Sequence, residues 1–501
     1  MFNFLLSEAA RLANAITIGK DRMTDEQYIV KEINNFKVSQ RRKEMIDGEK
    51  YYAGKHDILS RKRTVIGENG ELEEVHNLPN NRIVDNQYKK MVDQKNNYLL
   101  GQPISVQCEN EQYAKLLKQV FNKKFQRLMK AVGEDSLNCG LGWLFVHYNE
   151  RGELMFKRLR PFEIIPGWKD AEHTILDYAI RIYEVIAYEG QQEKVIQKVE
   201  VYDDKGITFF ELSDGDTLKP VEPFVQNYFT ITGEDGSETG YNWTKIPLIP
   251  FKYNNKEIPL IKMVKNLQDG LNVILSNFQN NMEEDVRNTI LILKNYDGQN
   301  LGEFRKNLAA VGAVKVRTVD GADGGVDKLT IEVNSENYKA IIEIFKKAII
   351  ENAMGYDAKD DRLAGNPNQM NIQSMYSDID LDANGMETEF QASFEDLLWF
   401  INCHFANMGM GDFEGEEVEI IFNRDILISE GEVIENCSKS VGVLSDETII
   451  ANHPWVDDPQ VEMERLKKQK EENMEQYGLA FNPATDQNGQ KNQESEEDIS
   501  D

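Results

Sequence analysis

Apolar residues recur at helical spacing on both sides of a polar stretch near residue 360. Apolar positions at every fourth residue predict a helix over 336–355. The stretch 356–372 has few bulky apolar residues and contains Gly, Asn and Pro, which favour a loop. The pattern then predicts a second helix over 373–408, about 55 Å long at 1.5 Å per residue. We therefore expect a polar loop between two helices.

An earlier apolar seam predicts a helix from Pro259 to Val286, about 40 Å long. Its apolar residues recur at alternating three- and four-residue steps, and proline is favoured in a first helical turn. One narrow seam over many turns indicates packing against parallel or antiparallel neighbours. The expected packing positions on these two helices are Ile261, Val264, Leu271, Phe278, Ile341, Phe345 and Ile349.

The segment between these helices changes to short alternating runs with many glycines. It predicts a small α/β insertion with strands at 289–296, 313–319 and 329–333 and a short helix at 301–312. The run DGADGGVD (320–327) is expected to be a flexible turn. Its glycines lack the lysine and Ser/Thr of a P-loop.

The first half of the chain mixes both periodicities. Helical stripes are expected up to about residue 60, with a helix end at Gly54, and again after Asp85, the expected N-cap. In the stripe after Asp85 we expect Lys95 to contribute only its aliphatic stem. A hairpin turning at Asn149–Gly152 and further strand-like runs follow, so residues 60–250 predict an α+β domain.

After the long helix, residues 416–422 predict a strand and 424–480 a series of helices, one of them capped by Ser445. Residues 481–501 have no periodicity and end in ESEEDISD, which predicts disorder. The expected fold class is α+β and largely helical.

Composition narrows the function. The chain has 501 residues, enough for several domains, and a formal net charge of −29. This charge argues against a protein that grips nucleic acid, which needs a basic patch, but not against one past which DNA slides. No apolar run reaches about 18 residues, so no membrane span is expected. The four separated cysteines suit free thiols in a reducing compartment.

Two basic clusters, 41–43 and 61–63, interrupt this acidic background. We interpret both as solvated faces; contact with DNA or a partner protein is the alternative.

Candidate chemistry is sparse. Residues 380–391 resemble a calcium loop, but position 12 is Gln391 instead of glutamate, and an acidic helix with a glycine kink is the preferred interpretation. The aspartates Asp357, Asp360 and Asp361 could hold a nuclease metal, but no companion ligands are identifiable. There is no Walker A, HExxH or GxSxG motif and no spaced Cys/His cluster. We therefore expect no enzyme activity, cofactor or metal.

Several ordered segments resemble one family. Four segments resemble the portal proteins of tailed double-stranded-DNA bacteriophages. They are NRIVDNQYKKMVDQKNNYLLGQPI, GWLFVHYNERGELMFKRLRPFEIIPGW, IPLIPFKYN before a long helix, and MYSDIDLDANGMETEF. The resemblance spans about residues 30–475 and is greatest to long-tailed phages of Gram-positive hosts.

The resemblance implies a multi-region portal fold that assembles into a dodecameric ring. Carried onto this chain, it gives a wing at 1–257, stem helices at 258–287 and 336–355, a clip at 288–335, a tunnel loop at 356–372, a long wing helix and strand at 373–423, crown helices at 424–480 and the acidic tail at 481–501.

The same resemblance implies a passive DNA channel at one capsid vertex of the virion, assembled in the host cytoplasm. Double-stranded DNA would pass with non-specific, transient contacts. A separate terminase large subunit would dock on the clip, head-completion or adaptor proteins would follow it, and scaffold and major capsid protein would contact the wing. The expected DNA-facing loop residues are Lys359, Asp360, Asp361, Arg362, Asn366, Asn368 and Gln369.

Two other function classes stay open at this point. One is a minor capsid protein without a channel, and the other is a metal-dependent nuclease that uses the loop aspartates. Rings with a central hole would favour the portal, and DNA cleavage abolished by Asp360→Ala would favour the nuclease.

Overall fold

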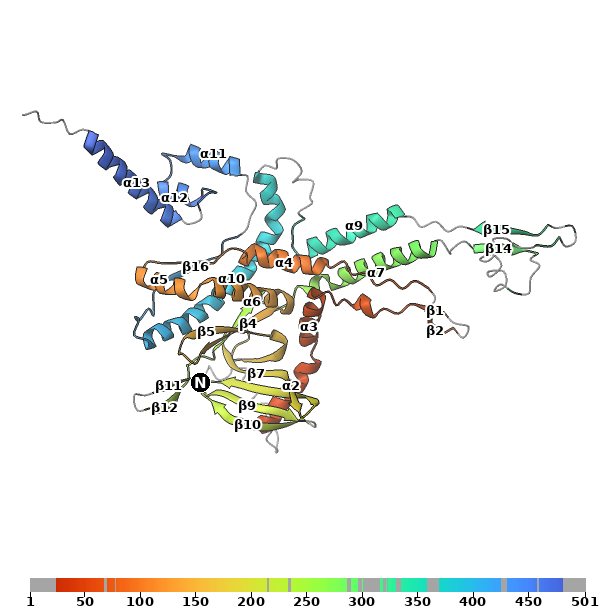
Figure 1. Cartoon of the computed structure of the whole chain (residues 1–501), viewed down its shortest axis with the longest axis horizontal. Coiled ribbons are helices and arrows are strands. Elements are labelled where there is room, and N and C mark those ends of the chain that lie inside the picture. Colours follow the sequence, from red (N-terminus) through yellow and green to blue (C-terminus); the bar gives the residue numbers. More distant parts are fainter. Residues whose placement is uncertain are drawn as a thin grey trace, which may run out of the picture. The chain divides into compact units, whose positions relative to one another are not determined.

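The computed structural model (Figure 1) describes residues 24–66, 70–76, 78–213, 216–232, 236–285, 290–295, 300, 316–318, 321, 323–329, 335–357, 369–424, 430–456 and 459–480. The described residues form two compact units. The first comprises those within 1–359 and 375–426, and the second those within 360–374 and 427–501. Runs of antiparallel strands and runs of helices follow one another along the chain, which agrees with the expected α+β class.

The helices up to residue 407 are α2 (Asp25–Val38), α3 (Gln40–Tyr52), α4 (Gln87–Leu100), α5 (Glu111–Val120), α6 (Lys123–Cys139), α7 (Ile261–Asp285), α9 (Ser335–Asn352) and α10 (Gln369–Asn407), with the 3-10 turns η2 (Asp57–Ser60) and η3 (Pro161–Glu163). The strands are β1 (Thr64–Ile66), β2 (Leu72–Glu74), β3 (Ser105–Cys108), β4 (Leu141–Tyr148), β5 (Leu154–Leu159), β6 (Ile164–Trp168), β7 (Leu176–Glu189), β8 (Gln192–Asp203), β9 (Gly206–Ser213), β10 (Thr217–Gln226), β11 (Phe229–Thr232), β12 (Glu238–Tyr241), β13 (Leu248–Lys252), β14 (Ile290–Lys294), β15 (Gly325–Leu329) and β16 (Val418–Ile421).

Side-chain oxygens begin most of the early helices. Thr24 forms a capping box with Gln27 at the start of α2. The expected cap of α4, Asp85, is wrong by one residue: Asn86 accepts a hydrogen bond from the Lys89 N–H at 2.9 Å. Asp85 is engaged elsewhere, because its backbone N–H and C=O are both bonded to side chains of α7. The expected helix end near Gly54 is confirmed, since α3 ends two residues earlier and Gly54 has a φ of +78°.

Two antiparallel sheets make up most of the strand content. One has the order β13-β4-β5, and the other is a five-stranded meander with the order β10-β9-β8-β7-β6. The expected hairpin at Asn149–Gly152 joins β4 to β5, where the Asn149 side chain accepts from the N–H groups of Arg151 and Glu153. The expected strand at 416–422 is confirmed as β16, which pairs with β3 about three hundred residues earlier in the chain.

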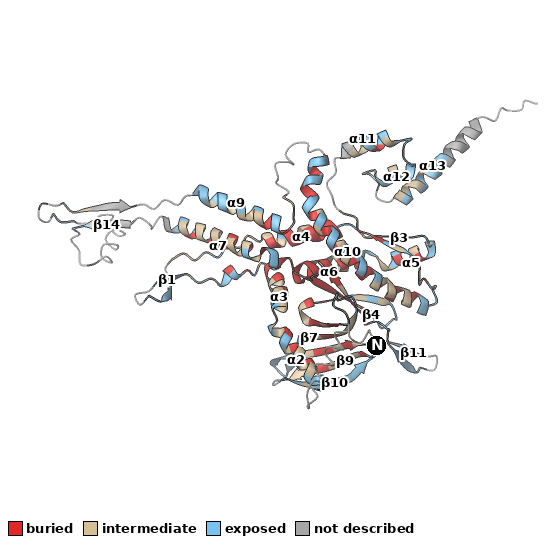
Figure 2. Cartoon of the chain, turned by 180° about the vertical axis from the view of Figure 1, so that it is seen from behind, coloured by how far each residue is buried: buried red, intermediate tan, exposed pale blue. Residues whose placement is uncertain are grey.

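The long helix α10 supplies an aromatic part of the core. Its Phe390 and Phe394 pack edge-on against Phe251 of β13, with ring centroids 5.1 and 5.6 Å apart. Figure 2 shows buried positions concentrated along α4, α6 and the middle of α10. Burying one such ring contributes about 1.5–3 kcal/mol. This contact fixes α10 to the sheet that precedes α7.

The helix α10 begins at Gln369, four residues before the expected start. Ile372, Met375 and Ile379 are buried at helical spacing, so the apolar stripe of this helix begins at Ile372, within the residues expected to be loop. The predicted loop therefore ends earlier than the polar composition indicated.

The helices α7 and α9 run side by side and antiparallel (Figure 1). Phe278 meets Tyr338 at a centroid distance of 4.9 Å, and Phe345 covers Gly270. A Cβ at Gly270 would lie 2.5 Å from the Phe345 ring, so glycine permits the close approach. The sequence predicted a parallel or antiparallel neighbour for the α7 seam, and within this chain α9 is an antiparallel one.

Between α7 and α9 the structure describes one antiparallel pair, β14 with β15. The expected strand at 289–296 is confirmed. The expected turn over 320–327 is wrong at its end, because Gly325–Asp327 belong to β15 and pair with β14. The glycines favoured a turn locally, but pairing with β14 places these residues in a strand and sets the register of β15. The expected helix at 301–312 and most of the strands at 313–319 and 329–333 lie outside the described residues.

The second unit contains α11 (Glu430–Ser440), α12 (Asp446–Ala451) and α13 (Pro459–Ala480). Ser445 caps α12 by accepting from the Thr448 N–H, as expected. The tail 481–501 lies outside the described residues. Among the helices that the structure describes, none is long and apolar enough to cross a membrane.

Candidate functional site

The chain turns sharply where α9 ends, just before the expected loop. Met354 has a φ of +50°, and the Gly355 N–H returns to the Ile350 carbonyl at 2.9 Å. Gly355 lies against α4, where a Cβ would come within 2.7 Å of Met91 Sδ and 2.8 Å of Gln94 Oε1. Only glycine fits this approach without moving its neighbours.

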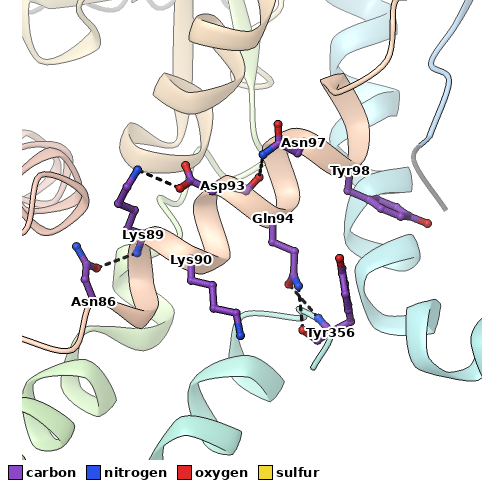
Figure 3. Close-up of a pocket in the computed structure, with 8 residues that line it drawn as sticks. All are labelled: Asn86, Lys89, Lys90, Asp93, Gln94, Asn97, Tyr98 and Tyr356. Atoms are coloured by element: carbon purple, nitrogen blue, oxygen red, sulfur yellow. Dashed lines mark hydrogen bonds and ion pairs between the residues drawn. The ribbon is translucent and has the colours of Figure 1, made fainter. Parts of the chain in front are cut away.

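Gln94 of α4 holds the next residue with two hydrogen bonds. Its Nε2 donates to the Tyr356 carbonyl at 2.9 Å, and its Oε1 accepts from the Tyr356 N–H at 3.0 Å (Figure 3). One amide side chain thereby satisfies both backbone groups of Tyr356, as a neighbouring strand would. The chain is thus fixed to α4 two residues before 358–368, which lie outside the described residues.

Lys95, the next residue of α4, connects the turn that follows α9 to α10. Its ammonium donates to the Met354 carbonyl at 3.1 Å and to Asp382 Oδ2 of α10 at 2.7 Å. The Tyr253 hydroxyl donates to the other Asp382 oxygen at 2.8 Å. The expectation that Lys95 contributes only its stem is wrong, because its charged end is buried and paired.

Burial sets the electrostatics of this ion pair. Desolvation lowers the pKa of Lys95, and the Asp382 carboxylate opposes that shift. Only 2% of the lysine side chain is exposed, against 15% for Asp382, so removal of either partner would strand a charge in the interior.

Three tyrosines line the same region. The Tyr376 ring of α10 lies between Tyr98 of α4, at 5.7 Å, and Tyr356, at 4.6 Å. Tyr98 and Tyr356 also border a cavity of about 540 Å³ along the outer face of α4, together with Asn86, Lys89, Lys90, Asp93, Gln94 and Asn97 (Figure 3). The rings therefore connect the α9 side of the segment to α10 independently of the Lys95 pair.

The residues that resemble a calcium loop form a polar network on α10. Arg424 donates to Asp380 at 2.8 Å and to Asn384 and Glu387 at 2.5 Å, and the Tyr98 hydroxyl donates to Asp380. Burial, and after it this bond to Asp380, raise the pKa of Tyr98. The carboxylates lie on a continuous helix and already have cationic or hydroxyl partners, so the preferred acidic-helix interpretation fits the geometry. No cluster of metal-ligating side chains occurs in the described part of the chain.

A ladder of buried polar side chains along α7 was missed by the sequence analysis. Four side chains spaced four residues apart accept hydrogen bonds from backbone N–H groups of the chain before and at the start of α4. Gln268 accepts from Tyr88 of α4, and Asn272, Ser276 and Asn280 accept from Asp85, Ile83 and Asn81. Helix rise over four residues, about 6 Å, nearly matches two residues of extended chain. The i, i+4 spacing of these polar residues was the available signal in the sequence.

The structure describes only one of the seven expected DNA-facing residues. Six of them lie outside the described residues: Lys359, Asp360, Asp361, Arg362, Asn366 and Asn368. Gln369 is the first residue of α10. What the structure brings together is the framework on both sides of them, built by Gln94, Lys95 and Tyr376.

Comparison with known proteins decides what this framework belongs to. A model of the family described as "Phage portal protein, SPP1 Gp6-like" matches residues 36–476. The chain belongs to this family of phage portal proteins.

Two curated portal proteins are similar along most of their length. That of Bacillus phage SPP1 is 28% identical over 436 residues, which cover 86% of this chain and 84% of the relative. That of Clostridium phage phiCD119 is 28% identical over 442 residues, covering 85% and 92%. The family resemblance read from ordered segments is confirmed, including its tie to phages of Gram-positive hosts.

In this portal protein, the expected packing positions on α7 and α9 take different environments. Ile261, Val264, Leu271 and Ile349 are buried within the chain. Phe278 and Phe345 pack between the two helices. Ile341 is 41% exposed. Packing between subunits stays a prediction for these positions, and Ile341 is the position left open for it.

The family is a structural one, which agrees with the expected lack of enzyme activity. Of the three aspartates weighed for a nuclease metal, only Asp357 belongs to the described residues.

Proposed function

We propose that this portal protein forms the ring-shaped channel at one capsid vertex through which genomic DNA enters and leaves. Family membership supports the portal assignment. The observation that supports the channel role is the fixing of described residues on either side of 358–368: Gln94 and Lys95 bond to Tyr356 and Met354, and Lys95 also pairs with Asp382 of α10. Fixed flanks suit a segment that touches passing DNA, because they keep its ends in place while the duplex moves.

The regions follow the family plan. We assign the wing to 1–257 with the strand within 417–423, the stem to 258–287 and 336–355, the clip to 288–335, the tunnel loop to the segment before α10, and the crown to 424–480. The pairing of β3 with β16 supports the inclusion of that strand in the wing. The antiparallel pair α7–α9, which leads to β14 and β15, supports the stem and clip.

The mechanism is passive. A separate terminase large subunit docks on the clip and drives DNA through the ring, and head-completion or adaptor proteins later replace it. Scaffold and major capsid protein contact the wing, during assembly in the host cytoplasm and in the virion. The net charge of −29 repels DNA phosphates, so contacts with the duplex stay weak and non-specific.

Electron microscopy of the purified full-length chain tests the channel. Rings with a central hole are the expected result; monomers, filaments or shells would contradict it and favour a minor capsid protein. Deletion of 360–370 should leave rings intact and stop DNA packaging. Normal packaging by that variant would refute the role given to the loop.

A further inference from the structure

A polar cavity of about 320 Å³ lies beside the second half of α7. It is lined by Arg61, Lys62, Arg63, Thr64 and Asn80 from the segment around β1 and by Asn277, Asn280 and Asn281 of α7. All eight lining residues carry a hydrogen-bonding side chain, and none is a carboxylate. This composition contrasts with the acidic balance of the chain as a whole.

Several of these groups have hydrogen-bonding capacity that the described part of the chain does not use. Arg61 Nη1 is buried and has no hydrogen-bond partner among the described residues. The side chains of Asn277 and Thr64 form no hydrogen bond with the residues that the structure describes. A buried guanidinium nitrogen without an acceptor is costly, which indicates that something else supplies one.

The surrounding contacts hold the walls in place. The Asn80 amide donates to the Arg61 carbonyl at 3.2 Å, Asn280 accepts from the Asn81 N–H at 2.8 Å, and Asn281 donates to the Tyr338 hydroxyl at 2.9 Å. Lys62 is paired with Glu74 at 2.9 Å. The wall is therefore built before any ligand arrives. Arg61 is its unpaired cation, since within the described ranges its Nη1 has no acceptor.

We propose that this cavity is a binding site for a phosphate group. The guanidinium, the Asn277 amide and the Thr64 hydroxyl offer more donors than the two oxygens of a carboxylate accept, whereas a phosphate presents three or four oxygens. The volume also leaves room for water, which takes about 30 Å³ per molecule. For Arg61, this proposal favours a contact site over the solvated face that the sequence analysis preferred for the 61–63 cluster.

The phosphate has two sources, free anion or the DNA backbone. Only the second rests on the proposed channel function. Binding of inorganic phosphate to the purified full-length chain is measured by phosphorus NMR line broadening, and a short DNA duplex is then added as competitor. Displacement of phosphate by the duplex identifies the backbone; no displacement identifies the free anion. Either result supports the site, and ring formation is scored separately.

Two variants and one matched control decide the assignment. Arg61→Gln removes the unpaired cation, and Asn277→Asp places a negative charge on the wall with little change of shape. Both should weaken phosphate binding at least tenfold, whereas Arg127→Gln, at an exposed arginine of α6, should change it less than twofold. Absence of binding to the wild type, or equal binding by Arg61→Gln and Arg127→Gln, overturns the proposal. If Arg61→Gln does not fold, unchanged binding by Asn277→Asp overturns it.

Discussion

Gln94 and Tyr356, 262 residues apart in sequence, are joined by two hydrogen bonds of 2.9 and 3.0 Å that use both groups of the Gln94 amide and both backbone polar groups of Tyr356. The pair lies at the last described turn before 358–368. A side chain of α4 thereby fixes the residue that precedes the segment we assign to the DNA channel.

Gln94→Met keeps the volume of the side chain and removes both bonds. We expect the free energy of unfolding to fall by about 1–3 kcal/mol, because two backbone groups lose their partners. Hydrogen exchange at the Tyr356 amide should accelerate. Gln102→Met, at an exposed residue just beyond α4, is the control and should leave both measurements unchanged. Unaltered exchange at Tyr356 in Gln94→Met would show that the anchor is elsewhere.

Gly355→Ala should destabilise the protein by about 1–3 kcal/mol, because the new methyl group meets Met91 and Gln94 at less than 3 Å. Gly385→Ala is a matched control on α10, where a Cβ meets nothing within 4 Å. It should stabilise the protein by about 0.5–1 kcal/mol through helix propensity. Thermal unfolding of both variants measures the contrast, and a shift of the same sign in both would contradict it.

Lys95→Met leaves the Asp382 carboxylate without its cation. Breaking a buried pair on one side costs about 3–5 kcal/mol, so we expect a large loss in denaturant unfolding. Lys115→Met, which breaks an exposed pair with Glu111, should cost less than about 1 kcal/mol. Adding Asp382→Leu to Lys95→Met should recover part of the loss. A small effect of Lys95→Met alone would mean that the pair contributes nothing.

His56 makes stability depend on pH. It is buried and stacked on Tyr51, and its Nδ1 faces the Asn272 amide nitrogen, which can only donate, so the ring is neutral and its Nε2–H donates to the Tyr51 carbonyl. Burial lowers the pKa of His56, while the nearby carboxylates Asp57 and Asp269 oppose this. The unfolded chain therefore takes up the proton first as pH falls below about 6.5.

Stability that depends on neutral His56 is present above pH 6.5 and is lost as pH falls through the lower folded pKa. Between pH 7.5 and 5.5 the wild type should lose on the order of 1 kcal/mol more than His56→Gln. Urea unfolding at both values measures this difference. His76→Gln removes an exposed histidine and should behave as the wild type; equal pH dependence in all three proteins would refute the assignment.

Ile341 tests packing between subunits. Ile341→Asp should leave thermal unfolding of the chain nearly unchanged, because the side chain is 41% exposed, but should shift the assembly from rings toward monomers in light scattering. Ile175→Asp places the same charge at another exposed isoleucine and should keep the assembly. Intact rings of Ile341→Asp would exclude this position from the subunit contact.

The sequence by itself determined the elements with strong periodicity. The seam from Ile261 to Phe278 needs a neighbour at helical spacing, and the stripe around Phe345 provides one, so α7 and α9 were predictable. Caps such as Ser445 were predictable because they depend on a few adjacent residues. The family was also recognisable from several sequence segments in a fixed order, although the sequence offers no catalytic motif.

Tertiary structure alone decided the polar contacts. Lys95 was read as an aliphatic stem because its partners, Met354 and Asp382, are more than 250 residues away and no local pattern pairs them. The cap of α4 is Asn86 and not Asp85. The backbone N–H and C=O of Asp85 are hydrogen-bonded to Asn272 and Gln268 of α7, which is distant in sequence. Hydrogen bonds depend on atoms brought within about 3 Å, whereas sequence periodicity reports only which face of an element is buried.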